Sequence, residues 1–371
     1  MEIGQLWQAC LVPAPQPTPE PQPIVTPLRT AAIFLVLTID PGAEDTVRDF
    51  LADASGLERA VGFRLPEGEL SAVIGIGSDL WDRLFGGPRP AELHPFRELR
   101  GPRHFAPATP GDLLFHLRAN QMDLCFEFAS QVMNRLGGVA EVVDEVHGFR
   151  YFDERDLMGF VDGTESPGGR AGEEAALVGP EDPDFTSGSY VIVQKYTHDL
   201  DSWNALSTEE QERAIGRHKL SDIEIPDDQK APDSHVALNT IEDADGNERQ
   251  ILRANMPFGS VGRQEFGTYY IGYAASPSVT EQMLQNMFIG DPPGNTDRIL
   301  DFSTAVTGTL FFAPSADFLD DPPDGPGAAT ALAADDDAAS TTGPPEPGPA
   351  STTPPSSGSL GIGSLRRSTP Q

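Results

Sequence analysis

Continuous apolar runs alternate with segments of helical periodicity through the first 150 residues of the chain. Residues 31–39 read Ala-Ala-Ile-Phe-Leu-Val-Leu-Thr-Ile, which predicts a buried strand ended by the turn Asp40-Pro41-Gly42. The predicted elements, in order, are strand 31–39, a helix with Val47, Phe50 and Leu51 on one face, strand 71–77, a short helix with Ser78 as its N-cap, strand 112–117, a helix with Met122, Cys125, Phe126, Ala129 and Met133 on one face that Gly137-Gly138 ends, and strand 139–146.

Apart from the short extra helix, this is the strand and helix order of a ferredoxin-like domain. The second half repeats the order less regularly, and it carries an insertion at about residues 220–266 that is too long for a plain connection. The predicted elements there are strand 189–196, a helix that a capping box opens at Ser207 and that runs to about His218, strand 268–274, helix 280–288 and strand 306–312. We therefore expect an α+β protein of two ferredoxin-like domains, over residues 28–165 and 166–315.

Both ends of the chain differ in composition from the residues between them. Residues 1–27 are rich in proline, which predicts a disordered or polyproline-like arm. Residues 316–358 contain mostly Pro, Ala, Gly, Ser, Thr and Asp, and this composition predicts a disordered linker. Apolar residues return within 359–371 as Leu360, Ile362 and Leu365, followed by Arg366-Arg367. Such a segment is either a frayed terminus or a docking peptide.

The charge and the cysteines narrow the class of protein. Against 57 acidic residues the chain has 25 basic ones, so its formal net charge is −32. This acidic excess argues against nucleic acid and against anionic membranes as partners. The longest apolar run is too short to cross a bilayer, and the N-terminus lacks the pattern of a secretory signal. Cys10 and Cys125 lie far apart and form no CxxC pair, so we expect a cytoplasmic protein without disulfides.

A glycine-rich loop at Gly159-Phe160-Val161-Asp162-Gly163 carries the first candidate for chemistry. Asp-Gly with a proline close behind is also typical of an ordinary turn. The Asp162 carboxylate has few cations near it in the sequence and can accept a proton from peroxide. Gly159 and Gly163 would let the backbone approach a flat cofactor closely.

A histidine after a capping sequence is the second candidate. His235 follows Pro232-Asp233-Ser234 and precedes three apolar residues, so it can lie on the first turn of a helix beside an apolar face. That setting suits an iron ligand in an apolar pocket. An ordinary histidine is the alternative interpretation, and His198 and His218 are the competing ligands among seven histidines.

The third candidate is an arginine and an asparagine in an apolar segment. Arg253 and Asn255 stand two residues apart in Ile251-Leu252-Arg253-Ala254-Asn255-Met256, so in an extended chain their side chains share a face. An arginine among apolar residues needs an anion nearby. Bound peroxide with negative charge building up is one such partner, and an acidic side chain is the other.

Together these motifs resemble the dye-decolourising peroxidases. Residues 159–163 match the GxxDG loop of that family, and His235, Arg253 and Asn255 follow at the spacing of its bacterial B-type members. The resemblance covers about residues 28–315. It implies two ferredoxin-like domains of the dimeric α/β-barrel type, with one haem b per subunit between an antiparallel sheet and helices. It also implies hydrogen peroxide as oxidant and bulky aromatic molecules, such as dyes and phenols, as one-electron donors.

The resemblance further implies a role for each matching position. His235 would bind the iron, while Asp162, Arg253 and Asn255 would lie on the opposite, distal side of the haem. Ser166 stands where the family loop often has Asn, and we expect this departure not to affect the chemistry. The remaining implied contacts are Arg217 with a haem propionate, Gly163, Thr164 and Glu165 with the haem, and Asp297, or alternatively Asp291, with the second nitrogen of His235.

The last residues resemble a cargo-loading peptide of encapsulin nanocompartments. The resemblance rests on Leu360-Gly361-Ile362-Gly363-Ser364-Leu365, whose three apolar side chains would fill pockets of the shell. It implies a homo-oligomer, a dimer or a hexamer, inside an encapsulin shell in the cytoplasm.

Other functions fit the same residues. The chain could be a haem-binding storage or shell-cargo protein with little turnover, or it could release iron from haem or oxidise something other than dyes. A Soret band without peroxide consumption would favour storage.

Overall fold

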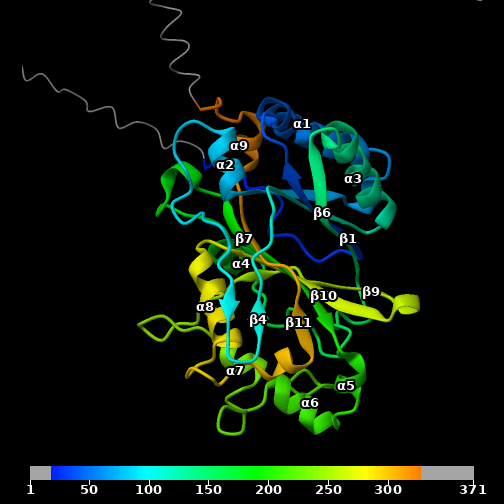
Figure 1. Ribbon diagram of the computed structural model, residues 1–371, viewed down its shortest axis with the longest axis vertical. Helices are drawn as coiled ribbons and strands as arrows, with labels where there is room; N and C mark the ends of the chain where they lie inside the picture. The colour runs from blue at the N-terminus through cyan, green and yellow to red at the C-terminus, as the bar shows by residue number, and fades with distance from the viewer. Residues whose placement is uncertain (1–17, 327–371) are drawn as a thin grey trace, which may run out of the picture. The chain divides into compact units, whose positions relative to one another are not determined.

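The computed structural model describes residues 18–326 of the 371-residue chain. Four antiparallel strands of the N-terminal half lie in the order β6-β1-β5-β2, which confirms the ferredoxin-like prediction (Figure 1). The elements of this half are β1 (Ala31–Ile39), α1 (Glu44–Gly62), η1 (Pro66–Gly68), β2 (Ser71–Gly77), α2 (Ser78–Leu84), β3 (Leu99–Arg100), β4 (Phe105–Ala106), β5 (Leu113–Ala119), α3 (Met122–Leu136) and β6 (Ala140–Phe149).

The C-terminal half continues the same sheet in the order β12-β7-β10 and repeats the arrangement. Its second strand consists of two short pieces, β8 and β9, which pair with β10 one after the other. The elements of this half are α4 (Gly169–Ala176), η2 (Pro183–Phe185), β7 (Ser189–His198), α5 (Leu200–Asn204), α6 (Thr208–Ile215), α7 (His235–Asn239), β8 (Leu252–Arg253), β9 (Met256–Ser260), η3 (Val261–Arg263), β10 (Glu265–Ala274), α8 (Pro277–Phe288), η4 (Arg298–Asp301), β11 (Ser303–Ala305), β12 (Thr309–Ala313) and α9 (Ala316–Asp320).

The two halves meet where β12 pairs with β2. The pairing is short, with Phe311 opposite Gly77 and Phe312 opposite Ile76. Beyond it, the buried side chain of Gln22 completes the backbone bonding: its Oε1 accepts from Ile74 N at 2.7 Å, and its Nε2 donates to Ile74 O at 2.9 Å and to Pro314 O at 2.8 Å. At the junction of the two halves, the Gln22 side chain thus makes hydrogen bonds that a neighbouring strand would otherwise make.

Residues 18–27 are therefore ordered, although the proline content predicted a disordered arm. Glu20 O accepts from Ala316 N at 2.7 Å, and Ile24 is buried. The first residues of the predicted linker are ordered too, because they form α9, whose Phe318 ring stacks on Trp81 with 5.3 Å between centroids. The prediction from composition missed the order of both segments because they contact each other across a long separation in sequence. Glu20 N donates to Asp317 Oδ2, and these two residues are 297 positions apart. Residues 1–17 of the predicted arm and 327–358 of the predicted linker, and the segment with Leu360, Ile362 and Leu365, lie outside the described residues.

The side chains of the sheet alternate between two apolar clusters. Ile33 and Leu35 of β1 belong to the cluster that includes residues of α1, α2 and α3. Phe34, between them, points to the other side and stacks on Tyr269 of β10 with 4.2 Å between ring centroids. The two halves of the sheet therefore pack against each other, and the helices cover their outer faces.

Two helical details differ from the prediction. The buried residues of α3 are Leu124, Cys125, Phe128, Val132 and Leu136, so the predicted face was rotated, and Phe126 is 57% exposed. Ser78 is the first residue of α2 rather than its N-cap, which is Gly77. Among residues 18–326 no helix combines the length and the apolar composition needed to cross a membrane.

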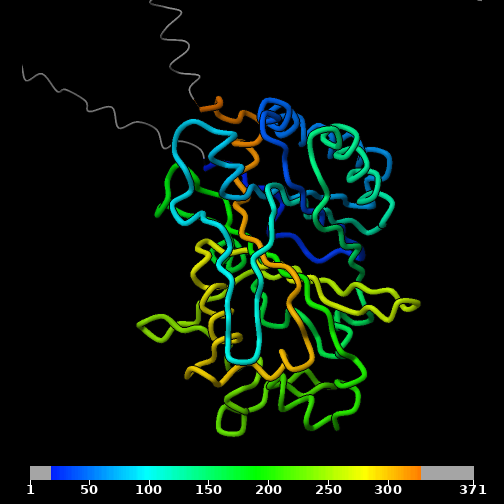
Figure 2. The backbone as a smooth tube through the Cα atoms, viewed as in Figure 1, coloured from blue at the N-terminus to red at the C-terminus, as the bar shows by residue number. Residues whose placement is uncertain are grey.

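A hairpin ties the N-terminal half to the C-terminal half. Figure 2 shows the chain around β3 and β4 (cyan) running down beside the C-terminal half, where it contacts α8 and β11. At its tip, Arg103 donates to Thr296 Oγ1 at 2.7 Å and pairs with Asp301 at 3.1 Å. The described residues consequently form one compact unit.

Candidate active site

The loop that carries Asp162 is held in shape by its own backbone and by buried side chains. Gly159 and Gly163 have φ angles of +93° and +80°, a region that L side chains rarely adopt. The positive φ favours glycine at Gly159, and a Cβ there would also lie 2.6 Å from Lys219 Cε, so the end of that lysine side chain would have to move. The buried Phe160 anchors the loop, and Asp162 N donates to Glu154 O at 2.8 Å. The position of the Asp162 carboxylate is thus determined by the fold around it.

Asn255 holds the Asp162 carboxylate from the strand side. Its Nδ2 lies 3.2 Å from Asp162 Oδ1 and 3.1 Å from Oδ2, and its Oδ1 accepts from Ile271 N at 3.0 Å. Since a backbone N–H can only donate, the Asn255 oxygen must face Ile271 and its amino group must face Asp162. The family resemblance alone had implied that Asp162 and Asn255 share a site. In the structure their side chains are in contact.

Arg253 lines the same cavity from β8. Within residues 18–326 its side chain has no hydrogen bond and no ion pair. An acidic side chain of this part of the chain is therefore not the anion that Arg253 was expected to need. Burial raises the pKa of the adjacent Tyr270 to about 12, so this phenol is neutral at ordinary pH and offers no negative charge. An unpaired guanidinium facing a cavity is suited to a small anion or to charge that develops there.

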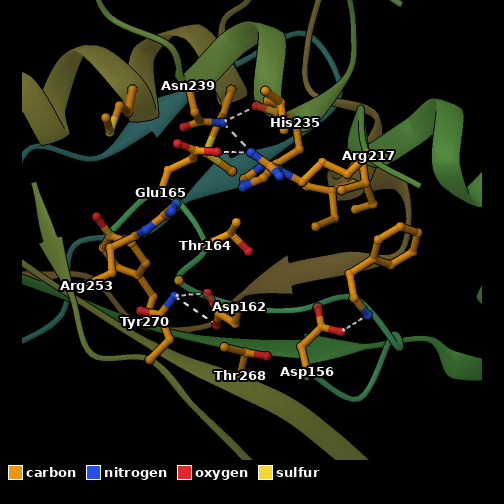
Figure 3. Close-up of a pocket in the computed structure, with 18 of the residues that line it drawn as sticks. Asp156, Asp162, Thr164, Glu165, Arg217, His235, Asn239, Arg253, Thr268 and Tyr270 are labelled. Carbon is orange, nitrogen blue, oxygen red and sulfur yellow. Dashed lines mark hydrogen bonds and ion pairs between the residues drawn. The ribbon is translucent and has the colours of Figure 1, made fainter. Parts of the chain in front are cut away.

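His235 lies on the opposite side of the cavity from Asp162 and Arg253 (Figure 3). It is the first residue of α7, so the predicted helical turn is confirmed, and of the two possible caps, Asp233 and Ser234, it is Ser234 that accepts from Ala237 N. Its Nδ1 lies 2.7 Å from Oδ2 of Asp297, which is fully buried. Because a carboxylate accepts, Nδ1 carries the proton, and the Nε2 lone pair is left available. Nε2 has no hydrogen-bond partner among the described residues.

Asn239 is a site residue that the sequence analysis missed. Its Nδ2 donates to His235 O at 2.8 Å and lies 3.4 Å from Asp297 Oδ2. It therefore helps to hold both members of the His235–Asp297 pair. A polar residue four positions after His235 on a helix lies on the same helical face, and this spacing was the signal available in the sequence.

The competing residues lie elsewhere or are already bonded. Both ring nitrogens of His198 are engaged, with Ser303 Oγ at 2.8 Å and Thr268 Oγ1 at 2.9 Å, and burial lowers its pKa to about 4. His218 lies outside the cavity and pairs with Glu212 at 2.9 Å. Asp291 is exposed, so Asp297 and not Asp291 is the acidic neighbour of His235.

The residues expected at the haem edge form a polar network on one wall. Arg217 is buried, pairs with Glu165, and lies 3.1 Å from Glu224. Thr164 donates to Asp222 at 2.6 Å. The structure therefore brings Gly163, Thr164, Glu165 and Arg217 to the cavity, but protein carboxylates already pair with the arginine. Its contact with a propionate stays a prediction.

Asp156 is a second cavity carboxylate that the sequence analysis missed. Its Oδ1 accepts from Phe160 N at 3.0 Å. Burial raises the pKa of Asp156 to about 7, the charge of Asp162 adds to the rise, and Lys219 is the neighbouring cation. With a pKa of about 7, Asp156 can take up or release a proton beside Asp162 near neutral pH.

Replacing Asp156 by Asn tests this proton. The pKa of Asp156 in the fold lies above its ordinary 3.8, so its contribution to stability is greatest below about pH 4 and is lost as pH rises through about 7. Asp156→Asn keeps the acceptor for Phe160 but does not ionise. We expect the unfolding free energy of the haem-loaded variant, relative to that of wild type, to rise between about pH 4 and about pH 7 by no more than about 4 kcal/mol and to level off above that, which thermal melts across this range measure. Parallel profiles of Asp156→Asn, wild type and the exposed control Asp201→Asn would contradict the assignment.

The side chains that line the cavity suit a haem in their chemistry. Across residues 18–326 no group of three or more His, Cys, Asp or Glu side chains could hold a bare metal ion. A single imidazole with an available Nε2 suits a metal that brings its other ligands in a macrocycle. The apolar side chains that line the cavity are Met158, Phe160, Ile215, Val236, Ile251, Met283, Leu284, Met287 and Ile299.

Comparison with known proteins gives matches over nearly the whole chain. The family models "Dyp-type peroxidase, N-terminal" and "Dyp-type peroxidase, C-terminal" match residues 21–150 and 153–318. A dye-decolorizing peroxidase of Rhodococcus erythropolis is 65% identical over 94% of this chain and 98% of its own length. One of Mycobacterium tuberculosis is 59% identical over 95% of this chain and 98% of its own length.

Solved structures agree. The encapsulated DyP-type peroxidase of Mycobacterium smegmatis superposes with a TM-score of 0.82 at 68% identity, over 83% of this chain and all of that one. A variant of DypB from Rhodococcus jostii, in complex with heme, superposes with a TM-score of 0.80 at 57% identity, over 81% of this chain and 98% of that one. With both family models matched and relatives this similar, the chain belongs to the dye-decolorizing peroxidase family and is a peroxidase.

Proposed function

We propose that this peroxidase binds one haem b through His235, reduces hydrogen peroxide, and takes electrons one at a time from bulky aromatic donors such as dyes and phenols. One observation carries the proposal: the His235 imidazole, with an available nitrogen, and the Arg253 guanidinium, which has no partner among residues 18–326, line the same cavity. The haem complex of the related DypB supports haem as the cofactor. Bound haem would supply the iron that binds peroxide and the oxidising equivalents taken from it.

Different side chains of the protein transfer the proton and stabilise the developing charge. The Asp162 carboxylate, held by Asn255 Nδ2, accepts a proton from the incoming peroxide and returns it to the departing oxygen, which leaves as water. The Arg253 guanidinium stabilises the negative charge that builds on that oxygen while the O–O bond breaks. Asp297 accepts the hydrogen bond of His235 Nδ1, which raises the basicity of the nitrogen that faces the cavity.

Each turnover consumes one peroxide and two donors. Hydrogen peroxide is reduced by two electrons and takes up two protons to give two waters, and two phenols each lose one electron and one proton to give two phenoxyl radicals.

The test is a spectrum of the purified chain with haem, before and after one equivalent of peroxide. We expect a Soret band that changes on addition of peroxide and returns when a phenol or dye is added, with the peroxide consumed. A normal Soret band that does not respond, with no peroxide consumed, would contradict the proposal and favour haem storage instead. Iron released from the haem during the reaction would favour the iron-release alternative.

We also propose that the chain is a homo-oligomeric cargo of an encapsulin shell in the cytoplasm. The support is the M. smegmatis neighbour, which is described as encapsulated, together with the apolar pattern of Leu360, Ile362 and Leu365. Burial of three such side chains contributes about 5 kcal/mol before the costs of association. That is weak for one site, so tight capture requires an oligomer, a dimer or a hexamer, that presents several tails.

Deleting residues 359–371 tests the cargo proposal. We expect the truncated chain to keep its peroxidase activity and to lose co-purification with a co-expressed shell. A full-length variant with Leu360, Ile362 and Leu365 all replaced by Ser should behave in the same way, whereas Ser368→Ala should still load. Full loading of the truncated chain would contradict the docking role of the tail.

A further inference from the structure

Ser166 makes two hydrogen bonds with the main chain of a single residue, Arg253. Its Oγ accepts from Arg253 N at 3.0 Å and lies 3.4 Å from Arg253 O, to which it donates. Nothing in the sequence pointed to this contact, and the expectation that Ser166 does not affect the chemistry was made without it. The contact makes Ser166 a neighbour of the backbone that carries the cavity guanidinium.

These two hydrogen bonds take the place of those that a further strand beside β8 would make. Arg253 stands opposite Gly272 in the pairing of β8 with β10, and the ladder bond there runs from Ala254 N to Ile271 O at 3.1 Å. The N–H and C=O of Arg253 point away from β10, toward the edge of the sheet, where β8 has no further strand among the described residues. An edge N–H and C=O need a partner, and the Ser166 hydroxyl serves both.

Ser166 is itself tied to the loop of Asp162. Its N–H donates to Gly163 O at 2.9 Å, which closes the turn that follows Asp162. The loop is thus joined to the strand at two points. One is the contact between the Asp162 and Asn255 side chains, and the other is the bond from the Ser166 hydroxyl to the Arg253 main chain. The second point holds the main chain of Arg253 against the loop that carries Asp162.

We propose that Ser166 is a positioning residue for the peroxide reaction, which it promotes by holding Arg253 at the place where charge develops. The inference rests on the proposed function. Its readouts therefore include one that does not depend on peroxide.

The first measurement is the rate constant for the reaction with peroxide in Ser166→Ala. Misplacing a charge-stabilising group by about 1 Å costs up to about 10²-fold, so we expect a loss of about 10- to 100-fold, with an unchanged Soret band and an unchanged KM for the aromatic donor. Ser202→Ala, which removes an exposed hydroxyl bonded to Asp199, is the matched control and should react like wild type. A wild-type rate in Ser166→Ala would overturn the proposal.

The second measurement separates positioning of Arg253 from a general loss of structure. In an Arg253→Leu background, Ser166→Ala should cause no further loss, since the group that it positions is gone. In an Asp162→Ala background it should still cost about 10-fold or more. Additive losses in the Arg253→Leu background would overturn the proposal.

The third measurement needs neither haem nor peroxide. Hydrogen exchange of the Arg253 amide should be faster in Ser166→Ala than in wild type, in the haem-free and in the haem-loaded protein. Should Ser166→Ala fail to fold, Ser166→Thr and Ser166→Val form a pair of equal shape in which only Thr keeps the hydroxyl. Thr should then retain slow exchange and fast peroxide reaction, and Val should lose both. Equal behaviour of Thr and Val would overturn the inference, while a wild type that does not react with peroxide would instead contradict the proposed function.

Discussion

His235→Ala is expected to remove stable haem binding, so that the purified variant has no Soret band after reconstitution. The expectation follows from the geometry, because His235 offers the available nitrogen of the cavity while both nitrogens of His198 are already bonded. The loss of affinity should exceed the roughly 10- to 100-fold typical of losing an outer hydrogen-bond partner. Titration of the haem-free protein with haem, followed at the Soret band, measures it.

Two further variants are expected to weaken haem binding less than His235→Ala does, or not at all. Asp297→Asn keeps the shape of the partner but removes its charge, so it should weaken haem binding by about 10- to 100-fold. His218→Ala, which alters an exposed histidine outside the cavity, should bind haem like wild type. A normal Soret band in His235→Ala, together with its loss in His198→Ala, would show that the iron ligand has been wrongly assigned.

Arg253→Leu is expected to slow the reaction with peroxide by about 10²- to 10³-fold while the haem stays bound. The estimate is taken from the loss of single donors that stabilise developing negative charge. It applies here because no acidic side chain of residues 18–326 pairs with Arg253, so its charge is available to the reaction. Stopped-flow mixing of the haem-loaded variant with peroxide gives the rate constant directly.

The controls separate charge from shape. Arg253→Lys keeps the charge and loses the planar fork, so its rate constant should fall between those of wild type and Arg253→Leu. Arg263→Leu removes an arginine whose side chain is 79% exposed, and it should react like wild type. If both Arg253→Leu and Asp162→Ala reacted at the wild-type rate, the distal site described above would be wrong.

The sequence predicted the regular elements best where burial is continuous. β1 and β2 begin and end at the predicted residues, because their apolar runs have no competing interpretation. The second strand of the C-terminal half was missed, since it is split into β8 and β9 and contains Pro257 and Gly259, both unfavourable inside strands. Local pattern therefore predicts a strand only where one uninterrupted segment forms it.

The site could be predicted only in part for a related reason. Asp162, Arg253 and His235 carry charge or a ligand atom, and their residue types could be recognised as candidates. Ser166, Asn239 and Asp156 act through contacts with other residues, and such contacts are set by tertiary structure. The Asp297 carboxylate illustrates the limit, because only the folded chain distinguishes it from Asp291 as the partner of His235.

The place of β12 in the middle of the sheet has a consequence for synthesis on the ribosome. β2 is buried along its whole length in the native protein, and the end of its edge at Ile76 and Gly77 is paired only once the last strand has been made. About 230 residues separate the end of β2 from the start of β12, which at roughly 5–20 residues per second corresponds to about 10–50 seconds of translation. During that time the nascent N-terminal half leaves this end of the β2 edge without its strand partner, and an unpaired strand edge can pair with another chain. We therefore expect stalled or C-terminally shortened chains that lack β12 to aggregate more readily than the full chain.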